Sequence, residues 1–130
     1  MNGGLRFCAV APTFVVSDIS ATMRWYETNL GFTGDPFPDE EPYVFAIMAR
    51  DKIEIMLQCI EGYQKPDLSA LRPAGVWDAY IRIEGVKEFY KLVRARIPIK
   101  SPLTKRSYGD WEFEVTDPNG YVLVFSELLE

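Results

Sequence analysis

Residues 107–127 read SYGDWEFEVTDPNGYVLVFSE, and this pattern predicts two β-strands joined by a tight turn. Apolar residues at 111, 113 and 115 alternate with polar residues at 112, 114 and 116, the period of two of a half-buried strand. The segment DPNG at 117–120 favours a turn, because proline restrains φ and glycine adopts positive φ without steric cost. The apolar run at 121–125 suits a central strand.

The sequence also contains an internal repeat, whose first copy lies in the upstream half of the chain. Apolar residues recur at helical spacing in two stripes, Ile19, Met23, Tyr26, Leu30 and Val86, Tyr90, Val93, Ile97. Each residue of the second stripe lies 67 positions after its counterpart in the first, and residue 83 has the same relation to residue 16. Because the same offset of 67 positions relates both the helices and their flanking strands, the sequence indicates an internal duplication.

The two halves are predicted to contain the same elements in the same order. The first has a strand at 9–16, a helix at 19–30, an extended piece from 32, and strands at 43–48 and 53–60. The second has a strand at 76–83, a helix at 86–97, an extended piece from 99, a loop at 102–108 and the closing hairpin. Ser17 and Asp18 are candidate N-caps of the first helix, and Gly31 should end it. We expect a single domain of the α+β class with modules at 7–60 and 76–128 and a linker at 61–75.

The composition is that of a globular protein and excludes several functions. The chain has 130 residues, of which 48% are apolar and 25% charged, with a net charge of −5. This charge argues against nucleic acid as a partner, and no apolar run is long enough to cross a membrane. The first residues lack the basic-then-apolar pattern of a secretion signal. Cys8 and Cys59 lie in apolar runs and are expected to be buried and reduced, which favours a cytoplasmic location.

Two segments resemble a known family. Residues 14–32, FVVSDISATMRWYETNLGF, are similar to the opening of the vicinal oxygen chelate superfamily, and residues 115–125, VTDPNGYVLVF, resemble its closing hairpin. The superfamily includes glyoxalase I, extradiol dioxygenases, and the bleomycin and fosfomycin resistance proteins. The resemblance implies paired βαβββ modules whose sheets curl into a cup around a small-molecule site, usually in a homodimer.

Strand alternation predicts which side chains line that cup. A helix covers one face of each sheet, so the more apolar set of each strand should pack against it. These sets are residues 12, 14 and 16; 53, 55 and 57; 79, 81 and 83; and 121, 123 and 125. The opposite sets bring together Glu54, Gln58, Asp78, Tyr80 and Arg82. Glu54 and Asp78 could work as an acid–base pair; alternatively, Arg82 pairs with one of them, or both are solvated.

The family's metal site draws one ligand from each of four strands, typically His, Glu, His and Glu. By resemblance, the corresponding positions are Ala11, Glu54, Asp78 and Val124. Alanine and valine side chains cannot bind a metal, and the chain contains no histidine. Two carboxylates alone make a weak site for a hard cation, and imidazole-containing sites for Zn, Ni or Fe cannot be built. We therefore expect no metal cofactor, with a divalent cation as the alternative.

The metal-free members of the family imply a binding function without chemistry. Our first hypothesis is a bleomycin-resistance-type protein that binds a small aromatic or cationic molecule. Candidate ligand contacts are the aromatic residues of the cup and its rim, with two polar residues: Tyr43, Phe45, Trp77, Tyr80, Tyr108, Trp111, Arg82 and Gln58. Core packing is the alternative for Trp77 and Phe45. The second hypothesis is a glyoxalase-like lyase or isomerase in which Glu54 and Asp78 move a proton next to a carbonyl, with or without a divalent cation.

Overall fold

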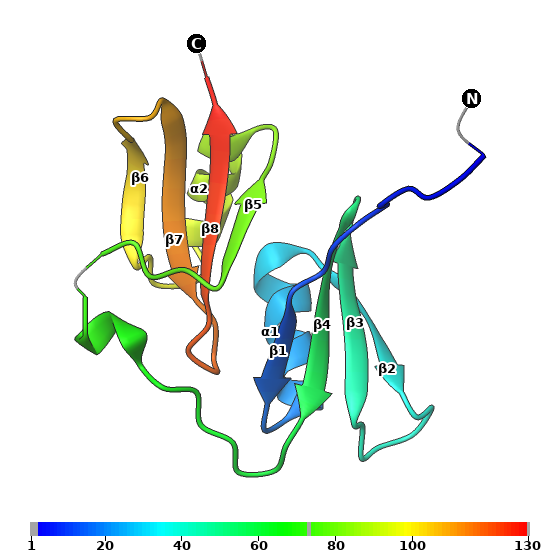
Figure 1. The fold of residues 1–130 in the computed structure, drawn as a ribbon. Helices are drawn as coiled ribbons and strands as arrows, with labels where there is room; N and C mark the ends of the chain where they lie inside the picture. The colour runs from blue at the N-terminus through cyan, green and yellow to red at the C-terminus, as the bar shows by residue number, and fades with distance from the viewer. Residues whose placement is uncertain (1–2, 73, 130) are drawn as a thin grey trace.

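A computed structural model describes residues 3–72 and 74–129, and it confirms two βαβββ modules of the α+β class (Figure 1). The elements of the first module are β1 (Thr13–Val16), α1 (Ile19–Leu30), β2 (Thr33–Phe37), β3 (Phe45–Arg50) and β4 (Ile53–Cys59). Those of the second are β5 (Ala79–Arg82), α2 (Val86–Arg94), β6 (Ser101–Lys105), β7 (Asp110–Thr116) and β8 (Val122–Leu128). A short 3₁₀ helix, η1 (Leu68–Ala70), lies between the modules in the sequence. The strand orders are β1-β4-β3-β2 and β5-β8-β7-β6, so the two sheets share one topology.

The helix ends follow from local chemistry. The Asp18 side chain accepts a hydrogen bond from the Ala21 N–H and begins α1 as predicted. Gly31 ends α1 in the left-handed region, with φ of 71°. In α2 the N-cap is Gly85, and a side chain from another element supplies the missing acceptor: Glu127 Oε1 receives the N–H groups of Gly85 and Val86.

Several predicted boundaries are wrong by a few residues. β1 begins at residue 13 rather than 9, and α2 ends at residue 94 rather than 97. The expected loop at 102–108 contains most of β6, which pairs with β7 at the edge of the second sheet. Pro102 had suggested a loop, but an edge strand tolerates proline because one side of its backbone has no ladder partner. Cys8 is exposed and Cys59 half-buried, so the expectation that both are buried is wrong.

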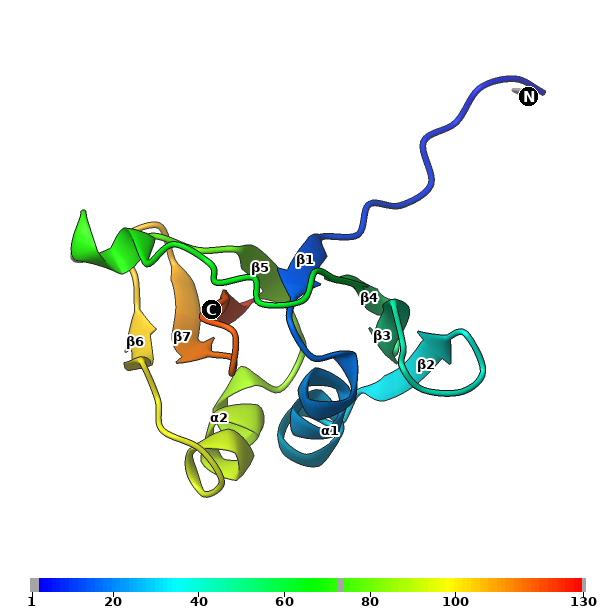
Figure 2. The same cartoon turned by 90° about the horizontal axis from the view of Figure 1, so that it is seen from below.

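The hydrophobic core lies between the two sheets and the two helices. The predicted helix-packed sets of β1, β4, β5 and β8 are confirmed where they are most buried, at Phe14, Val16, Ile55, Leu57, Ile81, Leu123 and Phe125. These residues from both modules belong to one contiguous cluster. Figure 2 shows α1 and α2 side by side beneath the sheets, and Arg96, just after α2, donates a hydrogen bond to the Thr28 carbonyl of α1.

The turn between β7 and β8 joins the second module to the first. Tyr26 on α1 donates its hydroxyl proton to Asp117 Oδ2 at 2.7 Å. Tyr121 stacks on Phe14 with ring centroids 4.1 Å apart, and its hydroxyl donates to the Val15 carbonyl at 2.7 Å. The DPNG turn therefore also serves as the main polar contact between the modules.

This contact decides where the uncovered faces of the sheets point. We call the face of each sheet opposite its helix the open face. Because the helix-covered faces turn toward one another, the two open faces point outward from the single chain (Figure 2). The expectation of one hollow shared by both halves is therefore wrong for one chain, whose sheets do not close around a common space. Among the described residues, no helix is long and apolar enough to cross a membrane.

Candidate functional site

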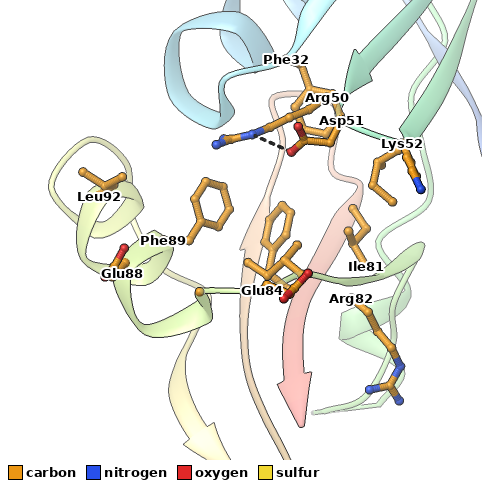
Figure 3. Close-up of a pocket in the computed structure, with 14 residues that line it drawn as sticks. Phe32, Arg50, Asp51, Lys52, Ile81, Arg82, Glu84, Glu88, Phe89 and Leu92 are labelled. Atoms are coloured by element: carbon orange, nitrogen blue, oxygen red, sulfur yellow. Dashed lines mark ion pairs between the residues drawn. The ribbon is translucent and has the colours of Figure 1, made fainter. Parts of the chain in front are cut away.

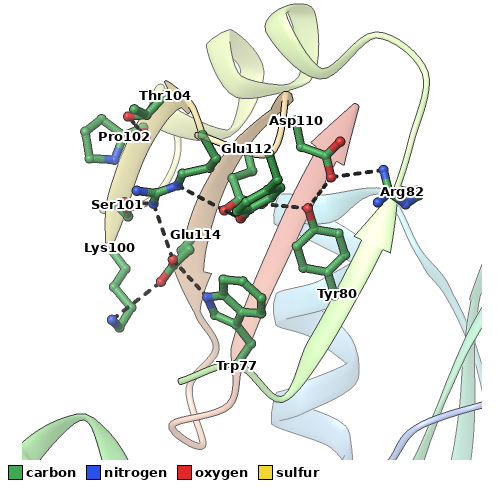
Figure 4. Close-up of polar contacts among 12 residues, drawn as sticks. Trp77, Tyr80, Arg82, Lys100, Ser101, Pro102, Thr104, Asp110, Glu112 and Glu114 are labelled. Carbon is green, nitrogen blue, oxygen red and sulfur yellow. Dashed lines mark hydrogen bonds and ion pairs between the residues drawn. The ribbon is translucent and has the colours of Figure 1, made fainter. Parts of the chain in front are cut away.

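The open face of the second sheet carries the densest set of polar contacts (Figure 4). Strand register places Arg82, Ser126 and Glu112 in one row across β5, β8 and β7. Tyr80, Val124 and Glu114 form the next row. Neighbours in such a row project from the same face of the sheet, so these side chains share one surface.

Three carboxylates along β7 are buried on this surface. Asp110, Glu112 and Glu114 are 4%, 0% and 3% exposed. The period of two predicted a half-buried strand, whereas in the structure the polar face of β7 is buried as well, because side chains of β5 and of the loops around β5 and β6 cover it. Buried carboxylates need hydrogen-bond donors or opposite charges to offset lost hydration.

Each carboxylate has such partners. Glu112 accepts from Tyr80 at 2.7 Å, from Arg106 Nε at 3.0 Å and from the Tyr108 hydroxyl. Glu114 accepts from Trp77 Nε1 at 3.1 Å and pairs with Lys100 at 3.5 Å.

Asp110, the first residue of β7, is the third of these carboxylates. Its Oδ2 lies 2.6 Å from the same Tyr80 hydroxyl, whose single proton Asp110 and Glu112 share, and it pairs with Arg82 at 3.0 Å. Since Arg82, Arg106 and Lys100 balance the three carboxylates, the surface has no excess charge that would by itself select an ionic ligand.

The tyrosine hydroxyls on this surface act as donors. Burial, followed by the hydrogen bond to Asp110, raises the pKa of Tyr80 well above its ordinary value. Burial and the bond to Glu112 raise the pKa of Tyr108 to about 12. Both phenols therefore stay protonated at neutral pH and hold the carboxylates. Ser126 Oγ is buried without a hydrogen-bond partner among the described residues, which leaves one polar atom beneath the surface for a water or a ligand.

Asp110 should make stability depend on pH in the acid range. Hydrogen bonds from Tyr80 and Arg82 hold the pKa of Asp110 below its usual range. A lowered folded-state pKa gives a stabilising contribution that is present above the unfolded pKa of about 3.9 and is lost as pH falls through the folded value. We expect the difference in unfolding free energy between the wild type and Asp110→Asn to be constant above about pH 5 and to decrease as the pH falls below the unfolded pKa. Urea titrations at several pH values would measure it, and a profile no steeper than that of exposed Glu84→Gln would contradict the assignment.

A separate crevice of about 670 Å³ lies on the helix side, between the end of β5, the start of α2 and the β3–β4 hairpin (Figure 3). Its apolar wall includes Phe32, Ile81 and Phe89, and Arg50 from the hairpin lies over the Phe89 ring at 5.3 Å. Of the predicted site residues, Arg82 lines this crevice.

Solved structures with the same architecture identify the fold. A glyoxalase-related enzyme from Clostridium phytofermentans superposes with a TM-score of 0.75 at 19% identity, covering 98% of this chain and 100% of that one. A bleomycin-binding protein from Streptomyces verticillus, solved with copper(II)-bleomycin, gives 0.69 at 19% identity and covers 94% and 97%. A glyoxalase/bleomycin resistance protein/dioxygenase from Alicyclobacillus acidocaldarius gives 0.71 at 17% identity and covers 95% and 92%. The chain has the vicinal oxygen chelate fold. The sequence matches no protein-family model and no curated protein at a significant level.

The metal positions of the vicinal oxygen chelate fold do not suit a metal here. Ala11 and Val124 offer no donor atom in their side chains. Asp78 already accepts the Val122 N–H at 2.8 Å and lies 3.5 Å from Lys65 Nζ. Within residues 3–72 and 74–129, no three His, Cys, Asp or Glu side chains are grouped to hold an ion.

The structure brings some of the predicted site residues together and separates others. Tyr80, Arg82, Tyr108 and Trp77 meet on the open face of the second sheet. Glu54 and Gln58 lie on the open face of the first sheet, and no described hydrogen bond or ion pair joins Glu54 to Asp78. Tyr43, just before β3, is half-buried against the core. Trp111 shares the helix side of β7 with Phe113, under Lys87 of α2 at 4.7 Å. Two of the candidate ligand contacts, Tyr80 and Trp111, therefore lie on opposite faces of the second sheet.

Sequence reasoning missed the three β7 carboxylates and the cations Arg106 and Lys100. A signal was present in the period of two, because acids at 110, 112 and 114 share a face with valines at 122 and 124 of the next strand. Acidic residues beside apolar neighbours on one face indicate a covered, paired surface.

Proposed function

We propose that this protein binds a small aromatic molecule, without a metal ion, on the open face of the second sheet. The observation that carries the proposal is the pair of partly exposed rings of Trp77 and Tyr80, whose centroids lie 5.1 Å apart at 45°. Hydrogen bonds to Glu114 and Glu112 hold these rings. Rings held in place before binding lose little side-chain entropy when a planar ligand stacks on them.

The net charge of the protein supports this proposal less strongly than the aromatic surface does. The net charge of −5 favours a neutral or cationic ligand over an anion. The local carboxylates are already paired, so stacking and hydrogen bonding would provide most of the affinity. The bleomycin-binding neighbour supports the small-molecule class and no particular ligand.

The lyase alternative receives no support from the placement of Glu54 and Asp78. An acid–base pair needs both carboxyl groups within reach of one substrate. Asp78 is engaged by Lys65 and by a backbone N–H of β8, whereas Glu54 is exposed on the other sheet.

We also propose that the protein works as a homodimer in the cytoplasm. The open face of the first sheet is uncovered in the single chain and exposes apolar surface, with Phe37 61% exposed, beside the polar Glu54 and Gln58. A surface of this kind is typical of an interface. The free thiols of Cys8 and Cys59 suit a reducing compartment.

Replacing Trp77 by alanine is expected to weaken binding of a planar aromatic probe by about tenfold, because one stacking surface is lost. The probes are proflavine, a cation, and coumarin, which is neutral, each titrated by fluorescence in the presence of EDTA. Glu114 keeps its contacts to Lys100 and Arg106 in this variant, so the fold should survive. Trp111→Ala is the matched control, because that ring lies on the opposite face of β7.

The proposal would be contradicted if neither probe binds the wild type. It would also be contradicted if Trp77→Ala and Trp111→Ala weaken probe binding equally. Probe binding that is found in a parallel titration without EDTA but not in its presence would contradict the metal-free part alone.

A further inference from the structure

The crevice on the helix side has the size and position of a small-molecule site, although it is remote from the open face of the second sheet (Figure 3). The first module contributes Phe32 and the β3–β4 hairpin to its lining, and the second contributes the end of β5, the start of α2 and Phe125. Its volume of about 670 Å³ falls within the range of about 300–1,000 Å³ that is usual for such sites, which often lie between structural units. A ligand in the crevice would contact both halves of the chain.

The floor of the crevice is apolar. Phe32, Ile81 and Phe125 are buried there. The Phe89 ring stands edge-on against Phe125, with ring centroids 5.0 Å apart at 78°. Leu92 of α2 is 58% exposed and continues the apolar lining to the rim. Because the aromatic rings are already packed against one another, an apolar ligand could cover them at little cost in side-chain entropy.

A cation from the β3–β4 hairpin is fixed at one side of this floor. Arg50 Nη1 donates a hydrogen bond to the Leu30 carbonyl at 2.7 Å, and the guanidinium lies over the Phe89 ring at 5.3 Å. The Nη2 donors of Arg50 have no partner within residues 3–72 and 74–129. Asp51 is 92% exposed and lies 4.0 Å from Nε, which is too far for a hydrogen bond. Arg50 is therefore held in place with donors free for a carboxylate.

Acidic side chains lie on the other side of the crevice. Glu84, just before α2, and Glu88, in its first turn, line the crevice apart from Arg50 in Figure 3. Both are exposed, and neither makes an ion pair with another residue that the structure describes. Arg82 does not neutralise them, because it pairs with Asp110 on the open face. An ammonium group is the complement of this side of the crevice.

We propose that the crevice binds a short apolar peptide with free ends, whose carboxylate contacts Arg50 and whose ammonium group faces Glu84 and Glu88. Its apolar side chains cover Phe89 and the floor. Opposite charges on the two sides favour a ligand that carries both charges over a fatty acid or an alkylamine, each of which complements one side only. An extended dipeptide spans about 7 Å, which allows its two ends to reach different sides. This site goes beyond the proposed function, since it shares no surface with the rings of Trp77 and Tyr80.

The first test is a calorimetric titration of the intact protein with leucyl-phenylalanine and three related compounds. N-acetyl-leucyl-phenylalanine lacks the ammonium group, leucyl-phenylalanine amide lacks the carboxylate, and glycyl-glycine lacks apolar side chains. We expect leucyl-phenylalanine to bind, and each of the other three to bind at least about tenfold more weakly, because each loses one of the three kinds of contact.

Substitution of Arg50 assigns the carboxylate to its side of the crevice. We expect Arg50→Gln to weaken binding of leucyl-phenylalanine about tenfold and to leave binding of its amide unchanged, because the amide lacks the group that Arg50 contacts. Circular dichroism would check that this variant folds, since the Leu30 carbonyl loses a donor.

Substitution of the acids provides an independent variant whose folding is not at risk. Glu84→Gln combined with Glu88→Gln should remove the preference for leucyl-phenylalanine over its N-acetyl form, because the ammonium group then has no carboxylate to face. Glu40→Gln combined with Glu61→Gln is the matched control. It removes the same charge at exposed positions outside the crevice and should leave the preference intact.

Backbone amide chemical shifts would locate the bound peptide. We expect the largest changes at residues 50–53 and 81–89, which line the crevice or adjoin it, and small changes at residues 110–114 of β7. The proposal would be overturned if leucyl-phenylalanine does not bind, if all four compounds bind equally, or if the two double variants behave alike. Loss of dipeptide binding in Trp77→Ala would also overturn it, because the peptide would then occupy the open face.

Discussion

Replacing Arg106 by methionine is expected to lower the free energy of unfolding by about 3 kcal/mol. Arg106 Nε lies 3.0 Å from Glu112 Oε1, and its Nη2 lies 3.8 Å from Glu114. The Glu112 side chain is 0% exposed, so removing the cation leaves a carboxylate that water cannot hydrate. We expect the low end of the range for a broken buried pair, because the Arg106 side chain is 33% exposed and Glu112 keeps two tyrosine donors.

Urea unfolding followed by circular dichroism would measure this loss, with Lys105→Met as the matched control. Lys105 is the preceding residue of β6 and is exposed, so its substitution should change stability by less than about 0.5 kcal/mol. Adding Glu112→Gln to Arg106→Met should recover part of the loss, because the unpaired charge is then removed. Equal effects of Arg106→Met and Lys105→Met would show that the network contributes nothing to stability.

Replacing Asp117 by alanine is expected to cost about 3 kcal/mol and to loosen the contact between the modules. Asp117 Oδ1 accepts the N–H groups of Asn119 and Tyr121 at 2.8 and 2.9 Å, and its Oδ2 accepts the Tyr26 hydroxyl. Tyr26 is 0% exposed, so its hydroxyl would be left buried without its acceptor. One side chain thus closes the β7–β8 turn and fastens α1 to it.

Asp67→Ala is the control for losing a local hydrogen bond between an aspartate side chain and the backbone. Asp67 also accepts a backbone N–H two residues on, from Ser69 at 3.0 Å, but it is exposed. Its loss should cost about 0.5 kcal/mol. In a double-mutant cycle, Asp117→Ala and Tyr26→Phe should be coupled by about 1 kcal/mol or more. Independent effects would show that the inter-module hydrogen bond does not stabilise the fold.

Much of the fold was predictable because its signals are local and occur twice. The helical stripes, Asp18 as N-cap and Gly31 as the terminating glycine depend on residues within a few positions of one another. The alternation in β1, β4, β5 and β8 identified the helix-packed sets correctly. The edge strand β6 was missed because Pro102 reads as a loop signal unless the position of the strand in the sheet is known.

The candidate site was less predictable, because its partners lie far apart in the sequence. Tyr80, Arg82 and Tyr108 were selected by parity or by aromatic character, and they do meet. Trp111 was placed with them although its parity is that of Phe113, on the helix side. The carboxylates of β7 were not selected, since nothing near them in the sequence shows that Arg106, Lys100 and Trp77 cover them.

The sequence alone determined the duplication, the order of elements and the division of each strand into two sets of side chains, because periodicity is a property of neighbouring residues. The tertiary structure alone decided which other parts of the protein each set of side chains contacts. It turned the helix-covered faces toward one another through the contact of Asp117 and Tyr121 with the first module, which separated Glu54 from Asp78 and left both open faces outward. A period of two assigns residues to a common face of a strand, but whether that face is buried depends on segments whose approach no local pattern encodes.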